Sequence, residues 1–593
     1  MRTIFWHRSA VVRSAIIPAC FFVILVLLYL ALRGSNKNEG DTGQIFVDEL
    51  KAERLGGNEV PFLDTTKMGN FEPEEEPIGD GPGEGGKAYQ IPSSKQHAAD
   101  VSIGLHKGIC VTASDDISLT RSIPDTRMEE CKHWNYPEKM GLTVSVVLVF
   151  HNEGFSTLMR NVHTILKRSP PEMIEEIILV DDCSNLEDTK EKLEKYIERF
   201  HGKVKLFRNA MREGLIRTRN IGAQKSKGDV VVFLDAHCEV NRNWLPPLLA
   251  PIYRNRKTMT VPFIDGINYK TFEYRPVYAA NALVRGIWEW GFFYKEMDLT
   301  PEQEAQRATK SEPYKSPTHA GGLFAIDRRY FEELGYYDDG LHVWGGEQYE
   351  LSFKVWQCGG SIEWVPCSRI GHIYRGHIPA GFHVPDTCKS RHDEPYIVQK
   401  NYKRVIEVWW EDKYKEYFYT REPLVRYLEH GDISRQLAFK EQNKCKSFEW
   451  FMENVSPDQL RKFPAPPPNV VWGEMKNVGS KNCFDSMNQG PGGKPGLSSC
   501  YGRGNQLLRL NSEGQLGFGE RCIDVDGGSD VKILVCPDGK VDGPWTYDQE
   551  KRTMFHNKQK RCLAVNPSTE ALVIRKCDSG NTYHQWVWKE SRP

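Results

Sequence analysis

The chain has 593 residues, a length that usually divides into two or three folded units. Its 78 Lys and Arg residues nearly balance 79 Asp and Glu residues, so nothing in the net charge indicates binding to nucleic acid or another polyanion. Hydrophobic residues make up 39% of the chain, which is enough to build large cores.

An apolar segment at residues 14–32 contains no charged side chain and is long enough to cross a bilayer as a helix. Arg2, Arg8 and Arg13 precede it. This excess of positive charge on the short side predicts a cytoplasmic tail at residues 1–13 and a lumenal remainder. A cleaved signal peptide is the alternative, but the apolar stretch is long for one.

The region between this membrane segment and residue 100 lacks a sustained apolar period. Residues 73–77 are acidic and proline-flanked, and residues 79–86 are rich in glycine. Such compositions bury too little apolar surface to fold. We therefore predict a disordered stem at residues 33–100.

Apolar segments alternate with helix-like segments in the next part of the chain. The expected strands are 144–150, 177–180, 204–207 and 230–234, and the expected helices end at residues 167, 200 and 225. This alternation predicts a doubly wound, mostly parallel sheet in a domain spanning residues 101–455. Polar residues follow each strand, so they should share one sheet edge, where ligands usually bind.

A proline-rich run at residues 464–468 marks a boundary within a linker predicted at residues 456–470. The remainder, residues 471–593, is rich in Gly, Asn and Asp turns. Three cysteine pairs recur there at similar spacing: Cys483/Cys500, Cys522/Cys536 and Cys562/Cys577. Three repeats of roughly 40 residues indicate threefold pseudo-symmetry.

Asp235 and His237 follow the last predicted strand of the sheet and form a candidate metal site. A carboxylate together with imidazole suits Mn²⁺. His372, which follows another apolar segment, is a candidate third ligand, although a single histidine is more often structural.

Three further residues have two possible roles each. Asp182, at the end of the second strand, is either a nucleotide contact or a helix cap. Arg212 is either a phosphate contact or a solvated surface residue. Glu347 follows two glycines and opens a helix, where it either faces a sugar or caps the helix.

Several motifs occur together and in order along the chain. They are Phe150-His151-Asn152-Glu153, Leu179-Val180-Asp181-Asp182, Arg212-Glu213-Gly214-Leu215, Leu234-Asp235-Ala236-His237, Ala320-Gly321-Gly322, Trp344-Gly345-Gly346-Glu347 and Gly371-His372. With them, the chain from about residue 125 to the C-terminus resembles the polypeptide N-acetylgalactosaminyltransferases. The resemblance implies a GT-A catalytic domain, a ricin-type β-trefoil lectin domain and a type II Golgi membrane protein.

The resemblance also implies roles for individual residues. Asp235, His237 and His372 would bind Mn²⁺, and Glu347 would be the essential acid near the sugar, acting with Asp235 in catalysis. The implied contacts of the UDP-GalNAc donor are Asp182, Arg212, Gly321, Trp344 and Arg375. The implied reaction transfers GalNAc to a Ser or Thr hydroxyl with retention at the anomeric carbon.

Two positions depart from the usual family pattern. Gln348 stands where most members have Asn, and this resembles the branch that prefers peptides already carrying GalNAc. Val149 replaces a Thr that contacts the nucleotide in other members. A transferase that initiates glycosylation on bare peptide is the first alternative, and a catalytically silent O-glycan-binding lectin is the second.

In the trefoil, a ricin-type sugar site needs an Asp, an aromatic residue or His, and an Asn. The first repeat has Asp485, Tyr501 and Asn505, so it is the first candidate. The second keeps Asp524 without the Asn, and the third has Ala564 in place of the Asp. A trefoil with a purely structural role is the alternative.

The cysteines agree with a lumenal location, where disulfides persist. We expect the three repeat pairs, Cys483–Cys500, Cys522–Cys536 and Cys562–Cys577, to be bridged. The family resemblance adds Cys131–Cys367 and Cys358–Cys445. It leaves Cys110, Cys183, Cys238 and Cys388 without an assigned partner.

Overall fold

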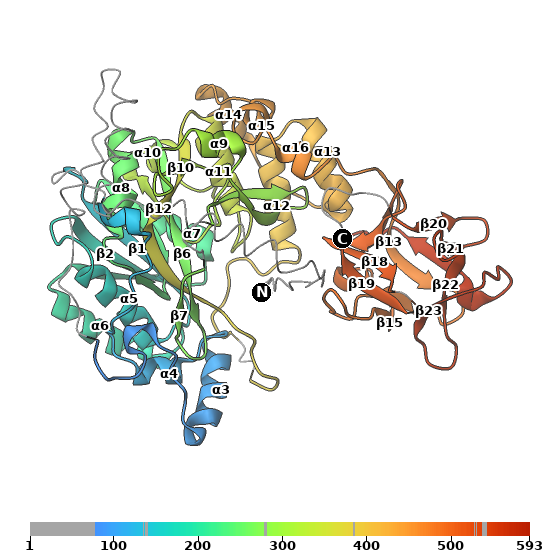
Figure 1. Cartoon of the computed structure of the whole chain (residues 1–593), viewed down its shortest axis with the longest axis horizontal. Helices are drawn as coiled ribbons and strands as arrows, with labels where there is room; N and C mark the ends of the chain where they lie inside the picture. The colour runs from blue at the N-terminus through green and yellow to red at the C-terminus, as the bar shows by residue number, and fades with distance from the viewer. Residues whose placement is uncertain are drawn as a thin grey trace, which may run out of the picture.

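The computed structural model describes residues 78–593 except 134–135, 137–139, 278–281, 383–385, 527, 529 and 537–542. Figure 1 shows a large α/β domain followed by a smaller all-β domain at the C-terminal end of the chain. The predicted cytoplasmic tail and membrane segment lie outside the described residues. Within the described part, no helix is both long enough and apolar enough to span a bilayer.

The α/β domain is organised around one sheet with the strand order β10-β12-β6-β11-β4-β1-β2-β3. Strands β3, β2, β1 and β4 run parallel to one another, as the alternating pattern predicts. Beyond them β11 is antiparallel to β4, so the other half of the sheet is mixed. The strands of this domain are β1 (Val144–Phe150), β2 (Ile174–Asp181), β3 (Val204–Arg208), β4 (Val230–Asp235), β5 (Cys238–Val240), β6 (Thr258–Asn268), β7 (Tyr274–Arg275), β8 (Val284–Glu289), β9 (Phe293–Asp298), β10 (Tyr314–Lys315), β11 (Phe324–Asp327) and β12 (Ser361–Tyr374).

Helices cover both faces of this sheet. Along β1, Val147 belongs to one apolar core, whereas Val146 and Leu148 belong to the core on the other face, because successive side chains of a strand alternate. The helices are α3 (Gln96–Leu105), α4 (Val111–Asp116), α5 (Phe155–Lys167), α6 (Glu191–Ile197), α7 (Leu215–Lys225), α8 (Leu245–Arg254), α9 (Pro301–Ala305), α10 (Arg328–Glu333), α11 (Glu347–Gln357), α12 (Ile397–Trp409), α13 (Asp412–Arg421), α14 (Ser434–Gln442), α15 (Phe448–Asn454) and α16 (Gln459–Lys462).

The predicted stem, residues 33–100, extends too far, because residues 78–100 pack on the α/β domain. The Glu84 carboxylate accepts a hydrogen bond from the Ser122 amide at 2.9 Å, and the Tyr89 amide donates to the Thr271 carbonyl at 2.8 Å. Gly83 and Gly86 adopt positive φ angles of 73° and 70°. This glycine-rich run is therefore ordered by backbone hydrogen bonds, which an apolar pattern does not reveal.

The predicted boundary at residue 455 is also wrong, and the linker is shorter than expected. Asp458 is buried and pairs with the buried Arg285, and Gln459 donates a hydrogen bond to the Trp288 carbonyl. The α/β domain therefore extends through α16. The first trefoil strand, β13, begins at Asn469, inside the predicted linker.

The all-β domain is the trefoil that the repeats predict. Its core gathers large apolar residues from all three repeats, including Phe484, Trp545 and Trp586. The first strand pairs with the last, β13 with β24, and this closes the domain. The strands are β13 (Asn469–Asn477), β14 (Cys483–Asp485), β15 (Gly496–Ser498), β16 (Leu508–Asn511), β17 (Leu516–Phe518), β18 (Arg521–Val525), β19 (Val531–Val535), β20 (Trp545–Asp548), β21 (Thr553–His556), β22 (Arg561–Val565), β23 (Leu572–Arg575) and β24 (Trp586–Lys589).

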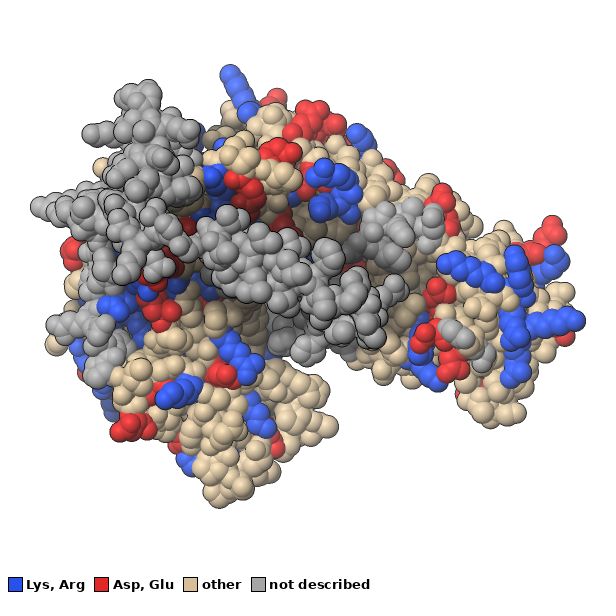
Figure 2. All heavy atoms as spheres, in the orientation of Figure 1, with Lys and Arg blue, Asp and Glu red and all other residues tan. Residues whose placement is uncertain are grey.

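Polar contacts join the two domains. Arg421 donates a hydrogen bond to the Gly519 carbonyl at 2.7 Å, and Lys295 forms an ion pair with Glu520 at 2.5 Å. On the face shown in Figure 2, basic and acidic side chains are interspersed over both domains.

Among the described residues, the disulfides comprise the five expected pairs and an additional one. Bridges join Cys131–Cys367, Cys358–Cys445, Cys483–Cys500, Cys522–Cys536 and Cys562–Cys577. Cys183 is bridged to Cys388, a pairing that the sequence left unassigned. Cys110 and Cys238 are buried free thiols.

Candidate metal and donor site

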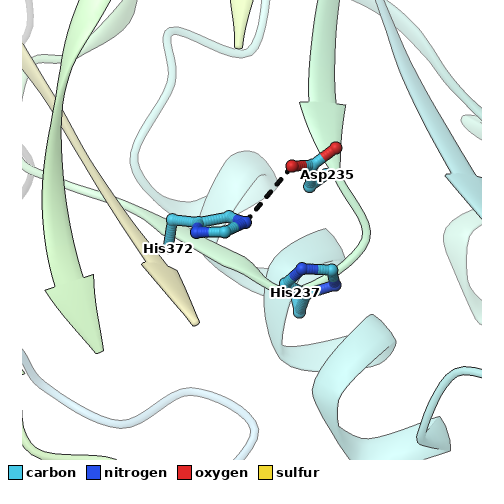
Figure 3. A group of neighbouring side chains, drawn as sticks. All are labelled: Asp235, His237 and His372. Atoms are coloured by element: carbon cyan, nitrogen blue, oxygen red, sulfur yellow. Dashed lines mark ion pairs between the residues drawn. The ribbon is translucent and has the colours of Figure 1, made fainter. Parts of the chain in front are cut away.

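Three sheet-edge side chains converge in the α/β domain: Asp235, His237 and His372 (Figure 3). Asp235 ends β4, and His237 lies in the turn to β5. β12 carries His372 and pairs with β5, and this places His372 opposite Cys238. The candidate ligand atoms of the three residues lie within 4.8 Å of one another, and His372 Nε2 is 3.2 Å from an Asp235 carboxylate oxygen. One carboxylate and two imidazoles in this arrangement can hold a divalent cation.

The local electrostatics keep these groups in the forms that bind a metal. Burial opposes ionisation of Asp235, but the hydrogen bond from His372 and the charge of Arg219 outweigh it and hold the Asp235 pKa well below its usual range. Burial lowers the pKa of His372. An ionised carboxylate and a neutral imidazole are the ligand-competent states.

Glu153 supports this cluster from behind, a role that the sequence did not assign. It is buried in the loop that follows β1, and its carboxylate accepts hydrogen bonds from His237 Nδ1 at 3.0 Å and from Arg375 at 2.8 Å. Burial alone would raise the pKa of Glu153, but the charges of Arg375 and His237 have the larger combined effect and lower it to about 2. Because the Glu153 carboxylate holds the Nδ1 side of the ring, His237 is oriented so that its Nε2 atom is free to bind a metal.

Arg219, on α7, is a second residue that sequence reasoning missed. It is buried and bridges Asp235 at 3.1 Å to the carbonyls of Gly321 and Gly322 at 2.7 and 2.9 Å. At Gly322 an added Cβ would lie 2.9 Å from the Asp235 carboxylate, so only glycine leaves room for the backbone there. Gly321 has a φ of 104°, which also favours glycine.

Glu347 is the first residue of α11 and is buried, with an exposed fraction of 3%. It accepts a hydrogen bond from the Gly345 amide at 2.8 Å. Burial raises its pKa, and the Arg219 charge opposes that rise. The glycine pair before the helix therefore places a carboxyl group of elevated pKa in the Asp235 and Arg219 neighbourhood.

The structure uses Asp182 to organise a loop. Its two carboxylate oxygens accept hydrogen bonds from the backbone amides of Glu213 and Gly214 at 2.8 and 2.9 Å. Asp182 therefore does not cap the helices that follow β2, whose N-caps are Leu186 and Lys190, and instead holds the turn that contains Arg212.

Arg212 lies in a cluster of basic side chains around one carboxylate. Asp386 contacts Arg212 at 2.6 Å, His151 at 2.6 Å and Lys107 at 3.1 Å. Desolvation raises the Asp386 pKa, but the Cys388 backbone amide and these neighbouring charges lower it overall to about 2. No motif in the sequence pointed to Asp386.

The remaining predicted donor residues are Arg375 and Trp344. Arg375 follows β12 and bonds to Glu153 and to the His106 carbonyl, the latter at 2.8 Å. Trp344 precedes α11 and is exposed to 39%. The structure therefore brings Arg375 next to the metal cluster, through Glu153, and leaves the Trp344 ring accessible.

In the trefoil, the first repeat gathers the predicted polar residues. The Asp485 carboxylate accepts hydrogen bonds from Tyr501 at 2.8 Å and from Ser498 at 2.7 Å, and Tyr501 remains 45% exposed. The Asn505 backbone carbonyl accepts from the Ser486 amide. In the second repeat, Asp524 is bonded to the buried His556 at 2.8 Å.

Comparison with protein-family models gives three matches. Residues 145–335 match the glycosyl transferase family 2 model, and residues 471–586 match the ricin-type beta-trefoil lectin domain. Residues 304–377 match the model described as the N-terminal domain of galactosyltransferase. The first and third matches together span the metal cluster.

Individual relatives match almost the full chain. N-acetylgalactosaminyltransferase 7 of Drosophila melanogaster is 51% identical over 99% of this chain and 100% of its own length. The Homo sapiens N-acetylgalactosaminyltransferase 7 is 46% identical over 89% of this chain and 80% of its own. A crystal structure of GalNAc-T7 with UDP, GalNAc and Mn²⁺ superimposes with a TM-score of 0.82 at 45% identity, covering 89% of this chain and 97% of that one. The chain belongs to the polypeptide N-acetylgalactosaminyltransferase family.

Proposed function

We propose that this enzyme transfers GalNAc from UDP-GalNAc to Ser or Thr hydroxyls of polypeptides and uses Mn²⁺ to do so. The observation that carries the proposal is the cluster of Asp235, His237 and His372 at the sheet edge. The match to a GalNAc-T7 structure containing UDP, GalNAc and Mn²⁺ supports the same ligands here.

Each part of the site contributes to the reaction in a defined way. The ion, when bound, supplies a positive charge for the donor diphosphate. Glu153 orients His237, and Arg219 fixes both Asp235 and the backbone at Gly321. Arg212 supplies positive charge for the donor phosphates. Glu347 would lie beside the sugar and orient it for transfer with retention, and no enzyme nucleophile is assigned.

The test of this proposal is transfer from UDP-GalNAc to a Ser/Thr peptide or glycopeptide with and without Mn²⁺. We expect Asp235→Ala to abolish transfer and the exposed-site control His201→Asn to retain it. Full activity in Asp235→Ala would remove this cluster from the mechanism.

We further propose that the preferred acceptor already carries GalNAc. Gln348, which follows Glu347 at the start of α11, supports this preference because it departs from the Asn of most members. Matched peptides, one bare and one with GalNAc on a neighbouring Thr, test it. Transfer confined to the glycopeptide is expected, whereas equal transfer to bare peptide would make this an initiating enzyme. Retained UDP binding without any transfer would favour the lectin alternative.

The trefoil extends this preference to distant GalNAc groups through its first repeat. The exposed Tyr501 ring beside the Asp485 carboxylate supports this assignment, since such a pair binds a sugar face and its hydroxyls. Asp485→Ala should remove the preference for a remote GalNAc while leaving short-peptide transfer intact. If Asp524→Ala has that effect instead, the second repeat is the binding site.

We also propose a type II Golgi membrane location, with the N-terminal apolar segment as the anchor. The supporting observations are the charge asymmetry around residues 14–32 and the disulfides of both domains. Protease treatment of sealed Golgi vesicles should spare both folded domains and remove only the short tail. Digestion of both domains would overturn this topology.

A further inference from the structure

A second cluster of metal-ligating side chains lies outside the catalytic cluster. His342 precedes Trp344 and α11, whereas His392 and Glu394 lie in the segment that leads into α12. The candidate ligand atoms of these three residues lie within 4.8 Å of one another. We propose that His342, His392 and Glu394 form a Zn²⁺ site that joins these two segments.

The distances within the cluster fit a tetrahedral ion. Two ligands of a tetrahedral zinc lie about 3.4 Å apart, given metal–ligand distances of about 2.1 Å. The same Glu394 oxygen is 2.9 Å from His342 Nδ1 and 4.0 Å from His392 Nδ1. These separations bracket the required value. The two imidazole rings are stacked, with centroids 3.5 Å apart, so one ring must turn out of the stack before both can bind the same ion in their ring planes.

The surroundings of the cluster are built to hold these ligands. Lys400 pairs with the second oxygen of Glu394, which leaves the first oxygen for the ion. The His342 backbone is fixed on both sides by Asn401, which accepts from its amide at 2.9 Å and donates to its carbonyl at 2.8 Å. Ser390 donates to the His392 carbonyl at 2.8 Å. Such partners orient metal ligands before the ion arrives.

The His392 ring has a nitrogen atom that lacks a hydrogen-bond partner. Its Nε2 atom is buried and has no hydrogen-bond partner among the described residues. Nδ1 of the same ring faces the Glu394 carboxylate at 4.0 Å. Two imidazoles and one carboxylate form a typical zinc ligand set with one position left for water.

Zinc at this site would connect two parts of the donor-site edge. The loop that contains His342 leads directly to Trp344 and Glu347. An isolated β-bridge between Val343 and Gly214 joins this loop to the loop that contains Arg212. A second isolated β-bridge, between Ser390 and Arg212, joins the segment that contains His392 to the same loop. A bound ion would therefore restrain the backbone that carries the predicted donor contacts.

The test counts zinc equivalents bound by the purified full-length protein. Zinc also competes with Mn²⁺ for imidazole ligands, so the catalytic cluster takes up one equivalent as well. We expect the wild type to bind two equivalents, and His392→Ala and His372→Ala one each. The exposed-site control His201→Asn should bind two. Crystals soaked in zinc should give an anomalous peak between His342 and His392.

Glu394→Gln serves as a second variant because it keeps the side-chain volume and therefore the fold. It should also lose one equivalent, and zinc should raise its melting temperature less than that of the wild type. Two equivalents in both His392→Ala and Glu394→Gln would overturn the site. Because the readout is zinc binding, this result is independent of whether the protein transfers GalNAc.

Discussion

Single residues behind the ligands decide the geometry of the metal cluster. Glu153 fixes the orientation of His237, and Arg219 ties Asp235 to the glycine pair after Ala320. Neither residue would be a metal ligand. Their contribution is to hold the ligand atoms close enough for one ion.

Replacing Glu153 by Gln should weaken Mn²⁺ binding by roughly 10- to 100-fold, because His237 loses its charged hydrogen-bond acceptor. The Mn²⁺ concentration that gives half-maximal activity measures this effect. Glu176→Gln is the matched control, since Glu176 is equally buried but bonds to Ser145, away from the cluster. An unchanged Mn²⁺ requirement in Glu153→Gln would show that His237 needs no such partner.

Replacing Gly322 by Ala should reduce kcat/KM by at least about tenfold, because the new Cβ would displace the Asp235 carboxylate that lies 2.9 Å away. Initial rates at saturating Mn²⁺ measure the loss. Gly490→Ala is the control, because an added Cβ there meets nothing within 4 Å. Equal rates in both variants would mean that Asp235 can shift without consequence.

At the scale of elements, the site depends on segments that are distant in sequence but adjacent in space. β12 brings His372 beside β5, and the Cys183–Cys388 disulfide fastens the segment before α12 to the end of β2. Asp182 directly precedes Cys183. The disulfide therefore restrains the backbone next to Asp182, a predicted nucleotide contact, and the backbone of the segment around Cys388.

Cys388→Ser should lower the free energy of unfolding by about 2–4 kcal/mol, because the bridge closes a loop with a sequence separation of 205. It should also raise the KM for UDP-GalNAc, since the Asp182 loop gains freedom. Thermal unfolding and donor kinetics measure the two effects. Cys562→Ser is the control: it destabilises the trefoil and leaves the donor KM unchanged. A Cys388→Ser enzyme with wild-type melting and KM would contradict both expectations.

At the scale of the whole molecule, the two domains meet around a group of charged residues. Arg421 contacts both Gly519 of the trefoil and Glu289 of the α/β domain. Glu422 next to it is partly buried. Burial raises the pKa of Glu422 to about 7, against the opposing charges of Arg509 and Arg421.

This raised pKa makes the domain contact sensitive to pH. An acid with a raised folded-state pKa stabilises the fold fully below about pH 4.5, and this contribution is lost as the pH rises toward about 7. Glu422→Gln should remove about 2 kcal/mol of this pH dependence, since one pKa unit corresponds to about 1.4 kcal/mol and the group is partly solvated.

Melting temperatures of wild type and Glu422→Gln between pH 4.5 and 7.5 measure the difference. The exposed Glu453→Gln variant provides the control and should keep the wild-type slope. Parallel curves for wild type and Glu422→Gln would show that Glu422 titrates normally.

The sequence by itself determined the parallel half of the sheet, the trefoil and the three residues of the metal cluster. Apolar runs such as Val230–Leu234 and the repeated cysteine pairs are local sequence patterns, and such patterns can be recognised without knowledge of the fold. Asp235 and His237 were predicted because chemistry-bearing residues follow strands, and strand ends share an edge. For His372 the strand pattern offered only a candidate. The ordered family motifs extended this interpretation to His372, Glu347 and Arg375.

Only the tertiary structure decided which groups support those residues. Glu153, Arg219, Asp386, the Cys183–Cys388 bridge and the His342–His392–Glu394 cluster each join segments far apart in the chain. The same holds for residues 78–100, which are ordered by hydrogen bonds to partners such as Ser122 and Thr271. Side-chain pairing across long sequence separations depends on the packing of the whole domain, and no local pattern of apolar and polar residues encodes it.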